Sequence, residues 1–201
     1  MAAPRKRERI SWFPVPTRRR AGPEIAALWD RASERLGFVP NVMKAYAYKP
    51  ERFLRWWAHY DGLMRGESGL TKAQREMIAV VVSATNRCHY CVASHSAALR
   101  VLTGDPQLVD QVAVNYRHAP LGARERAMLD LAVKVTEESY RISPADYRPL
   151  LRAGWTEADV WDVIEVAAMF NFTNRMASSL GWAPNEVYGS MGRPPDASAR
   201  P

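Results

Sequence analysis

Apolar residues recur through the middle of the chain at the three- and four-residue spacing of amphipathic helices, and no segment keeps the alternation typical of a strand. Pro23 and Pro50, each followed by glutamate, mark two helix starts. Thr71 and Gln74 form the capping-box pattern that marks a third start. The pattern predicts an all-α bundle of about eight helices with short connections.

Two of the expected helices resemble each other in sequence. Four residues of the first recur in the second at an offset of 51, namely Leu70, Arg75, Met77 and Val82 against Leu121, Arg126, Met128 and Val133. Chance similarity of amphipathic helices explains this as well as an internal repeat does. In either case Ala127 stands where the first copy has Glu76, and no cysteine follows it.

Proline and basic residues are concentrated near the N-terminus. Residues 1–20 contain seven basic side chains and one acidic side chain, so they carry +6 of the net charge of +7. We therefore expect a solvated basic arm at residues 1–22, a nearly neutral helical domain at residues 23–190 and a loose tail at residues 191–201. Contact of the arm with nucleic acid or an acidic partner is the alternative, and nucleic acid is not the partner we expect.

The composition is that of a globular protein, with 47% apolar and 24% charged residues. The longest apolar stretch, from Met77 to Val82, is too short to span a bilayer. The N-terminus has charges and prolines where a signal peptide has an apolar core. We expect a soluble, cytoplasmic protein that has no membrane partner.

The chain has two cysteines, Cys88 and Cys91, which are three positions apart. A disulfide between them closes almost no loop, unlike the widely spaced cysteines of a secreted scaffold. In a reducing compartment such a pair is more often catalytic or metal-binding than structural.

A helical hairpin is predicted around this pair. Asn86 tolerates the left-handed conformation that ends helices, so one helix ends near it and the next begins near Cys88. In the second helix Cys88, Cys91 and His95 lie one turn apart on a shared face. Glu76 lies ten residues before Asn86, and His95 lies nine residues after it. Their side chains are therefore expected to meet on neighbouring antiparallel helices.

These residue types suit thiol chemistry. The thiolate is the nucleophile, and an unperturbed cysteine with a pKa of about 8.5 is mostly protonated at neutral pH. His95 can take the thiol proton, and Glu76 can orient the imidazole and stabilise its charged form. A second thiol in reach converts a sulfenic acid into a disulfide before over-oxidation. We predict four catalytic residues, Cys91, Cys88, His95 and Glu76, with no cofactor and no metal.

The pattern leaves the attacking sulfur and the function open. The helix N-terminus favours Cys88 as the nucleophile, whereas the position of His95 favours Cys91. A zinc-stabilised binding module could use these three residues, with His59 or His118 as a distant fourth ligand. The pair could also serve thiol–disulfide exchange or redox sensing without peroxidase turnover, or consist of unreactive buried thiols.

The spacing of Glu76, Cys88, Cys91 and His95 resembles the active-site pattern of alkylhydroperoxidase D within the carboxymuconolactone decarboxylase-like superfamily. Further stretches resemble the branch of uncharacterised peroxidase-related proteins, namely residues 12–16, 37–41, 86–91 and 170–175. The resemblance covers roughly residues 10–190.

This resemblance implies an alkylhydroperoxidase D-like all-α fold and oligomers built from helical hairpins. It also implies antioxidant reduction of hydroperoxides, in which Cys91 forms the sulfenic acid and Cys88 resolves it as a redox-active disulfide. Tyr90 departs from the pattern, because alkylhydroperoxidase D has a histidine there. The decarboxylases of the superfamily lack the cysteine pair, so lactone decarboxylation is not expected.

The expected partners are a hydroperoxide substrate, an unidentified dithiol reductant and further copies of the chain. The segment 51–64 carries four rings at helical spacing, Phe53, Trp56, Trp57 and Tyr60. A helix that is apolar over so much of its circumference needs covering on more than one side, and a homo-oligomer would cover it. Tryptophans could instead line a substrate pocket or fill the core.

Overall fold

The computed structural model describes residues 9–195. This part of the chain forms ten α-helices and four short 3-10 helices, and no strand lies in it. The α-helices are α1 (Arg18–Ala21), α2 (Pro23–Leu36), α3 (Asn41–Tyr46), α4 (Pro50–Arg65), α5 (Lys72–Thr85), α6 (His89–Thr103), α7 (Pro106–Asn115), α8 (Ala123–Glu138), α9 (Arg148–Arg152) and α10 (Glu157–Ser179). The 3-10 helices are η1 (Tyr116–His118), η2 (Ser139–Arg141), η3 (Pro144–Tyr147) and η4 (Glu186–Gly189). The prediction of an all-α bundle is confirmed, and the additional helices, such as α1 and α9, are short.

The predicted helix starts are confirmed as well. Pro23 and Pro50 occupy the first positions of α2 and α4. The Gln74 backbone donates to Oγ1 of Thr71 at 3.2 Å, and the Thr71 backbone donates to Oε1 of Gln74 at 2.9 Å. Thr71 and Gln74 provide partners for backbone amide groups that have none inside a helix. Proline has no amide hydrogen, so at the first position of a helix it leaves none unpaired.

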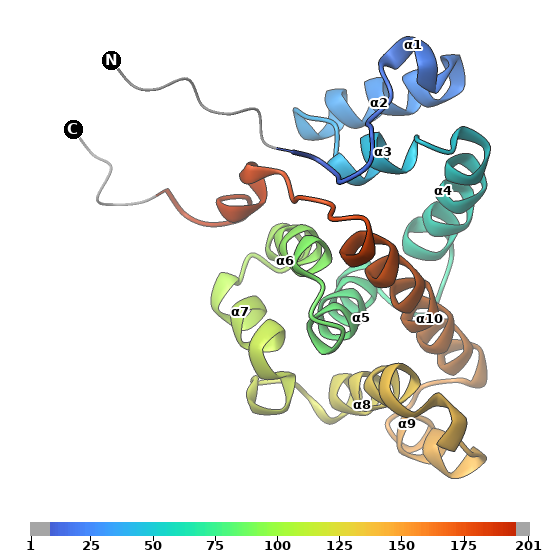
Figure 1. Ribbon diagram of the computed structural model, residues 1–201. Helices are drawn as coiled ribbons and strands as arrows, with labels where there is room; N and C mark the ends of the chain where they lie inside the picture. The colour runs from blue at the N-terminus through green and yellow to red at the C-terminus, as the bar shows by residue number, and fades with distance from the viewer. Residues whose placement is uncertain (1–8, 196–201) are drawn as a thin grey trace.

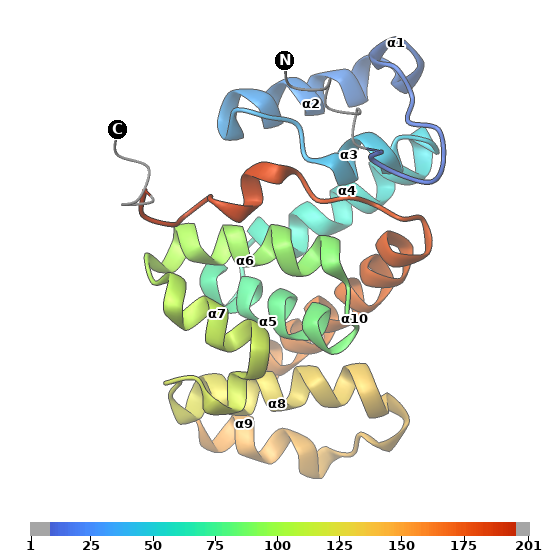
Figure 2. The ribbon, with the colours of Figure 1, turned by 60° about the vertical axis from the view of Figure 1, so that its left-hand side comes forward.

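Helix α5 lies at the centre of the bundle and contacts α6, α7, α8 and α10. In Figure 1, α1, α2 and α3 form one end of the molecule, and α8 and α9 form the opposite end. Figure 2 shows that α6 and α7 lie between these two ends. The hairpin of α5 and α6 therefore borders the N-terminal helices on one side and the main core on the other.

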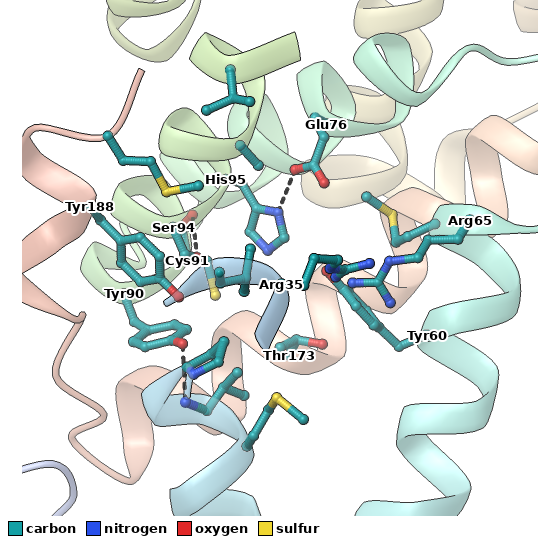
Figure 3. Close-up of a pocket in the computed structure, with 18 of the residues that line it drawn as sticks. Arg35, Tyr60, Arg65, Glu76, Tyr90, Cys91, Ser94, His95, Thr173 and Tyr188 are labelled. Atoms are coloured by element: carbon teal, nitrogen blue, oxygen red, sulfur yellow. Dashed lines mark hydrogen bonds and ion pairs between the residues drawn. The ribbon is translucent and has the colours of Figure 1, made fainter. Parts of the chain in front are cut away.

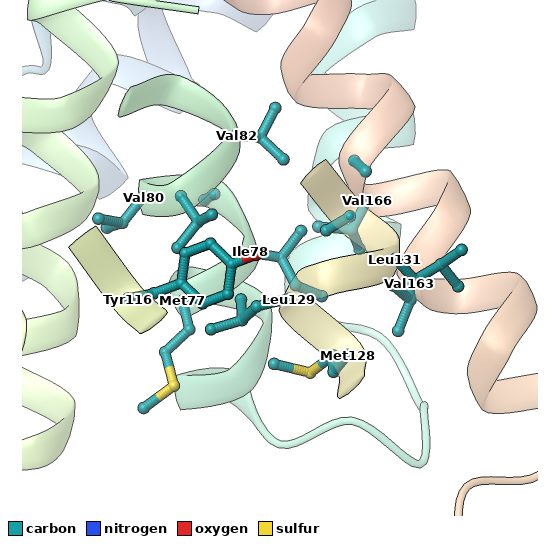
Figure 4. Close-up of a cluster of buried hydrophobic side chains, with 14 of the residues drawn as sticks. Met77, Ile78, Val80, Val82, Tyr116, Met128, Leu129, Leu131, Val163 and Val166 are labelled. Carbon is teal, nitrogen blue, oxygen red and sulfur yellow. The ribbon is translucent and has the colours of Figure 1, made fainter. Parts of the chain in front are cut away.

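An aliphatic core surrounds α5, because this helix is apolar over most of its circumference. The predicted apolar stretch, Met77 to Val82, is buried throughout. It belongs to one cluster with Met128 of α8 and Val163 of α10 (Figure 4). Burial of one such side chain contributes about 1.5–3 kcal/mol, so this cluster fixes the first helix of the hairpin. No helix in residues 9–195 is long and apolar enough to cross a membrane.

A second cluster, the aromatic cluster, lies between the hairpin and the N-terminal helices. Its buried rings are Trp29, Tyr46, Phe53, Trp56, Tyr90 and Trp182. Two of these rings come from α4, and the other two rings of α4, Trp57 and Tyr60, are half-buried. The chain itself therefore covers much of α4, the helix on which the prediction of a homo-oligomer was based. The homo-oligomer stays a prediction.

The turn between α5 and α6 differs in detail from the expectation. Asn86 has a φ of −79°, and Arg87 takes the left-handed conformation with a φ of 54°. The prediction that one helix ends near Asn86 and the next begins near Cys88 is confirmed, but the left-handed residue of the turn is Arg87 and not Asn86. The side-chain nitrogen of Asn86 instead donates to the side-chain oxygens of Asn171 and Asn174, both at 2.9 Å. These bonds tie the turn to α10.

The described part of the N-terminal segment packs against the end of α10. The Trp12 backbone donates to the carbonyl of Leu180 at 2.9 Å. Gly181 has a φ of 61°, and a Cβ there would lie 2.3 Å from the Trp12 ring, so this position requires glycine. Residues 1–8 of the predicted arm and residues 196–201 of the predicted tail lie outside the described residues.

Candidate functional site

Helix α6 carries the two cysteines at its N-terminal end. Cys88 is the N-cap and Cys91 lies in the first turn, and both are free thiols with 1% of their surface exposed. The backbone N–H of Cys91 lowers the pKa of the Cys88 thiol, although the Cys88 side chain makes no capping hydrogen bond. The helix N-terminus therefore stabilises negative charge on Cys88.

Glu76 of α5 and His95 of α6 meet across the hairpin. Oε2 of Glu76 lies 2.6 Å from Nδ1 of His95, and both side chains are largely buried. Because a carboxylate only accepts hydrogen bonds, Nδ1 carries the proton and Nε2 is left as a base. The imidazole stands edge-on to the Phe170 ring at 4.6 Å between centres. In Figure 3 it lies between the carboxylate and the sulfur of Cys91.

The two thiols hold their protons unequally. The hydrogen bond with Cys91 lowers the pKa of Cys88 to about 6, and Ser178 acts in the same direction. The bond with Cys88, together with burial, raises the pKa of Cys91 well above its usual range, although Asn174 opposes the rise. The pair therefore loses its first proton from Cys88 more readily than an isolated cysteine does, and its second proton less readily.

A cavity of about 450 Å³ borders the hairpin. Cys91, Ser94, His95 and Glu76 line it, whereas Cys88 does not (Figure 3). Its walls carry six aromatic rings, those of Phe38, Trp56, Trp57, Tyr60, Tyr90 and Tyr188. Three basic side chains, Arg35, Arg65 and Lys72, also line it. The cavity therefore borders Cys91 but not Cys88.

Tyr90 occupies the position at which the resemblance suggests a histidine. Its hydroxyl accepts from the backbone N–H of Val42 in α3 at 3.0 Å and donates to the hydroxyl of Tyr188 in η4. Burial raises the pKa of Tyr90 far above its usual range. The phenol therefore holds α3 and η4 against the hairpin, and its proton is already engaged.

An amide network from α10 lies beside the cysteines and was absent from the sequence-based prediction. Asn174 is buried and donates to Oγ of Ser83 at 2.9 Å. Both side chains also hydrogen-bond to Cys91 and favour its thiolate form. The available signal was Asn171 with Asn174, two amides one turn apart in an apolar stretch, because unpartnered buried amides are costly.

The zinc alternative requires four converging ligands. In the described residues 9–195, no group of three or more histidine, cysteine, aspartate and glutamate side chains could hold a metal ion. His59 instead lies 4.0 Å from Glu165, and His118 belongs to η1. Neither of these histidines lines the cavity beside the cysteines.

Fold and site together define an all-helical protein with a Cys-x-x-Cys pair at a helix N-terminus and a bonded glutamate–histidine pair beside it. A model of the carboxymuconolactone decarboxylase family matches residues 50–115, which run from α4 to α7. The crystal structure of an alkylhydroperoxidase D core, an uncharacterized peroxidase-related protein from Ralstonia eutropha, is 42% identical and superposes with a TM-score of 0.92. That similarity covers 94% of this chain and 100% of the other.

A second peroxidase-related protein, from Silicibacter sp., is 44% identical with a TM-score of 0.87, over 92% of this chain and 97% of the other. The chain belongs to the alkylhydroperoxidase D-like, peroxidase-related proteins of the carboxymuconolactone decarboxylase family. Human sestrin-2 is 21% identical over 142 residues, which are 71% of this chain and 28% of sestrin-2. The chain thus spans less than a third of that curated relative.

Proposed function

We propose that this protein is a thiol-dependent peroxidase that reduces hydroperoxides through a dithiol–disulfide cycle of Cys91 and Cys88, in an antioxidant role. One observation carries the proposal. The Cys91 thiol lines the same cavity as the bonded Glu76–His95 pair, and a second thiol is hydrogen-bonded to it. The description of the similar crystal structures as peroxidase-related supports it.

Cys91 is the attacking sulfur in this proposal, because only it has access to the cavity. The electrostatics favour the thiolate on Cys88 instead, since its pKa is lowered and that of Cys91 is raised. Access decides between them, because the proton of Cys91 can leave at the moment of attack. Nε2 of His95 is the base for that proton, and Glu76 stabilises the imidazolium that forms.

Cys91, Cys88 and His95 account for every bond and proton that changes during the oxidation. His95 takes the proton of Cys91, and the sulfur attacks the outer peroxide oxygen. The S–O bond forms as the O–O bond breaks, and His95 returns the proton to the leaving oxygen, so an alcohol departs and Cys91 becomes a sulfenic acid. Cys88 then attacks that sulfur, the S–S bond forms, and the hydroxide takes a proton and leaves as water. A dithiol reductant restores the pair by exchange and becomes a disulfide itself.

The burial of both sulfurs favours peroxidase turnover over exchange with a protein partner. Thiol–disulfide exchange requires a foreign sulfur to approach along the S–S axis, and each cysteine has 1% of its surface exposed. A hydroperoxide is smaller than a protein thiol and would approach Cys91 from the cavity that this residue lines. By the same reasoning, we expect the reductant to be a small dithiol that fits the cavity.

Hydroperoxide consumption in the presence of dithiothreitol tests the proposal. The wild type should turn over, Cys91→Ser should not, and Cys88→Ser should react once and then stop. A sulfenic-acid probe should label Cys91 in Cys88→Ser and leave Cys91→Ser almost unlabelled. Mass spectrometry of the wild type after one equivalent of peroxide should show the loss of two hydrogens without added oxygen. Unchanged free thiols after that treatment contradict the proposal.

A further inference from the structure

The cavity beside Cys91 combines apolar walls with an excess of positive charge. Its charged lining residues are Arg35, Arg65, Lys72 and Glu76. On this basis we propose that the substrate is an amphipathic organic hydroperoxide, with an apolar body and a carboxylate at the end remote from the peroxide. This inference rests on the proposed peroxidase function and names its substrate class.

The positive charge at the cavity is not balanced within residues 9–195. Arg65 forms an ion pair with Asp61, and Glu76 is bonded to His95. Arg35 and Lys72 are exposed and have no acidic partner in the described part of the chain. Two cationic groups are therefore free to pair with an anion that enters the cavity.

The hairpin places one of these cations at a defined distance from the reacting sulfur. Glu76 and His95 meet across the antiparallel helices α5 and α6. Lys72 lies one turn before Glu76 on α5, and Cys91 lies one turn before His95 on α6. Lys72 and Cys91 therefore lie on opposite sides of the Glu76–His95 pair, about two turns or roughly 11 Å apart along the hairpin. A peroxide at Cys91 and a carboxylate near Lys72 would be separated by that length.

Arg35, the second unpaired cation, and the aromatic walls suit the same kind of substrate. Figure 3 shows Arg35 and Arg65 reaching the cavity from α2 and α4. The wall also carries aromatic rings, among which Trp56 and Tyr60 stack at 5.2 Å between ring centres. A cavity of about 450 Å³ is of the size that takes a small organic ligand. Hydrogen peroxide would leave most of this apolar surface in contact with water.

A lining residue of the same wall also contains an unpartnered donor. Trp56 is 8% exposed, and its indole N–H is buried with no acceptor among the described residues. Buried N–H groups of tryptophan are nearly always hydrogen-bonded, so an acceptor is missing here.

Single-turnover oxidation of the reduced protein tests the inference without any reductant. The probes are ω-hydroperoxydecanoate, whose extended chain suits the expected separation, and its uncharged methyl ester. The second-order rate constant of the wild type should be about tenfold higher for the acid than for the ester, and the preference should shrink with salt. In the double variant Arg35→Gln/Lys72→Gln the two rate constants should become equal, through a loss for the acid alone.

The control removes two charges from the same region but outside the cavity. Arg31→Gln/Lys49→Gln changes exposed residues that do not line it, and this variant should keep the preference for the acid. Equal rate constants for acid and ester in the wild type, or a preference that survives in Arg35→Gln/Lys72→Gln, overturn the inference. A slower ester reaction in that variant also overturns it, since the cations would then act on something other than the carboxylate.

Failure of the proposed function gives a different result. In that case neither probe oxidises Cys91, and tert-butyl hydroperoxide does not oxidise it either. The substrate class is then decided by equilibrium binding of ω-hydroxydecanoate and its methyl ester, followed by tryptophan fluorescence. Tighter binding of the acid that depends on Arg35 and Lys72 supports an anionic amphipathic ligand, and equal binding of the two rejects it.

Discussion

Helices α5 and α8, whose sequences correspond at an offset of 51, occupy similar surroundings in the fold. They pack against each other and both pack against α10. Met77 and Met128, which correspond to each other, are both buried. Gln74 and Glu125 also correspond, and their side chains bond to each other at 3.2 Å.

Each of these helices also holds an arginine in the same place. The fourth residue of each helix donates through its guanidinium group to carbonyls that precede the helix. The bonds run from Arg75 to Leu63 and Gly66, and from Arg126 to Arg117 and Ala119. In both cases one acceptor lies nine residues before the arginine. This correspondence favours an internal repeat over chance similarity.

The two regions differ in what is built on this scaffold. The hairpin of α5 continues into α6, a helix of 15 residues that carries the cysteines. After α8 come η2, η3 and the five-residue α9 instead. Glu76 corresponds to Ala127, which packs against the aliphatic core. The arginine and the apolar face are therefore common to both copies, whereas the carboxylate, imidazole and thiols are present in only one of them. Stability and activity should then be separable by mutation.

The largest expected effect is a loss of activity without a loss of stability at the cysteine hairpin, and the reverse in the scaffold around α8. Cys91→Ser should lower peroxidase kcat/KM by about 10³-fold or more, because the nucleophile is gone, with little change in stability. Met128→Ala should lower the free energy of unfolding by about 3 kcal/mol, through lost burial and a cavity, and leave kcat/KM of the folded protein nearly unchanged. Activity assays and urea unfolding of both variants measure the two effects. A large loss of activity in folded Met128→Ala would show that the scaffold and the chemistry are not separable.

The next effect concerns the carboxylate that distinguishes α5 from α8. Glu76→Gln and His95→Gln should each lower kcat/KM by about 10²-fold, since general acid–base catalysis has roughly this size. The double variant should add little to either single variant, because the two side chains act as one unit on the thiol. The pH at which iodoacetamide alkylation of the thiols accelerates should rise in all three. Additive effects in the double variant would mean that the bond between these residues does not serve catalysis.

The two arginines provide a smaller but sharper comparison. Arg75 is buried and Arg126 is half-buried, so replacement of Arg75 disturbs the more deeply buried site. Arg75→Met should lower the free energy of unfolding by about 3 kcal/mol and Arg126→Met by about 1 kcal/mol. Urea unfolding of both variants at one pH makes the comparison. Equal losses would indicate that burial does not distinguish the sites.

Sequence alone predicted those features of the site that depend on local rules. Counting residues on both sides of the turn predicted that Glu76 and His95 lie at the same depth, and they are in contact. This prediction needs only the helical rise and an antiparallel hairpin. The prolines and the capping box gave correct helix starts for the same reason, because the groups involved lie within four residues of one another.

Features that depend on distant segments escaped the sequence analysis. The partners of Asn86 are amides of α10, 85 and 88 residues away, so no local pattern could assign its conformation. The role of Tyr90 depends on Val42, a residue of another helix. The rings of α4 were expected to need a second copy of the chain, and the aromatic cluster covers much of them. On α10, by contrast, the rings of Trp161 and Phe172 are exposed. The homo-oligomer therefore stays a prediction.

The smallest expected effect is a dependence of stability on pH that only the cysteine-bearing copy can produce. The pKa of Cys88 is about 6 in the folded protein, below its value of about 8.5 in an unfolded chain. Between these values the unfolded chain binds more protons than the folded one, so the stability of the reduced protein should rise with pH from 6 to 8.5 and lose this contribution as pH falls through 6. We expect a rise of about 2 kcal/mol in urea unfolding under reducing conditions. Cys88→Ser should remove it, and Met128→Ala should keep it at a lower overall stability. A rise that persists unchanged in Cys88→Ser would place the titrating group outside the hairpin of α5 and α6.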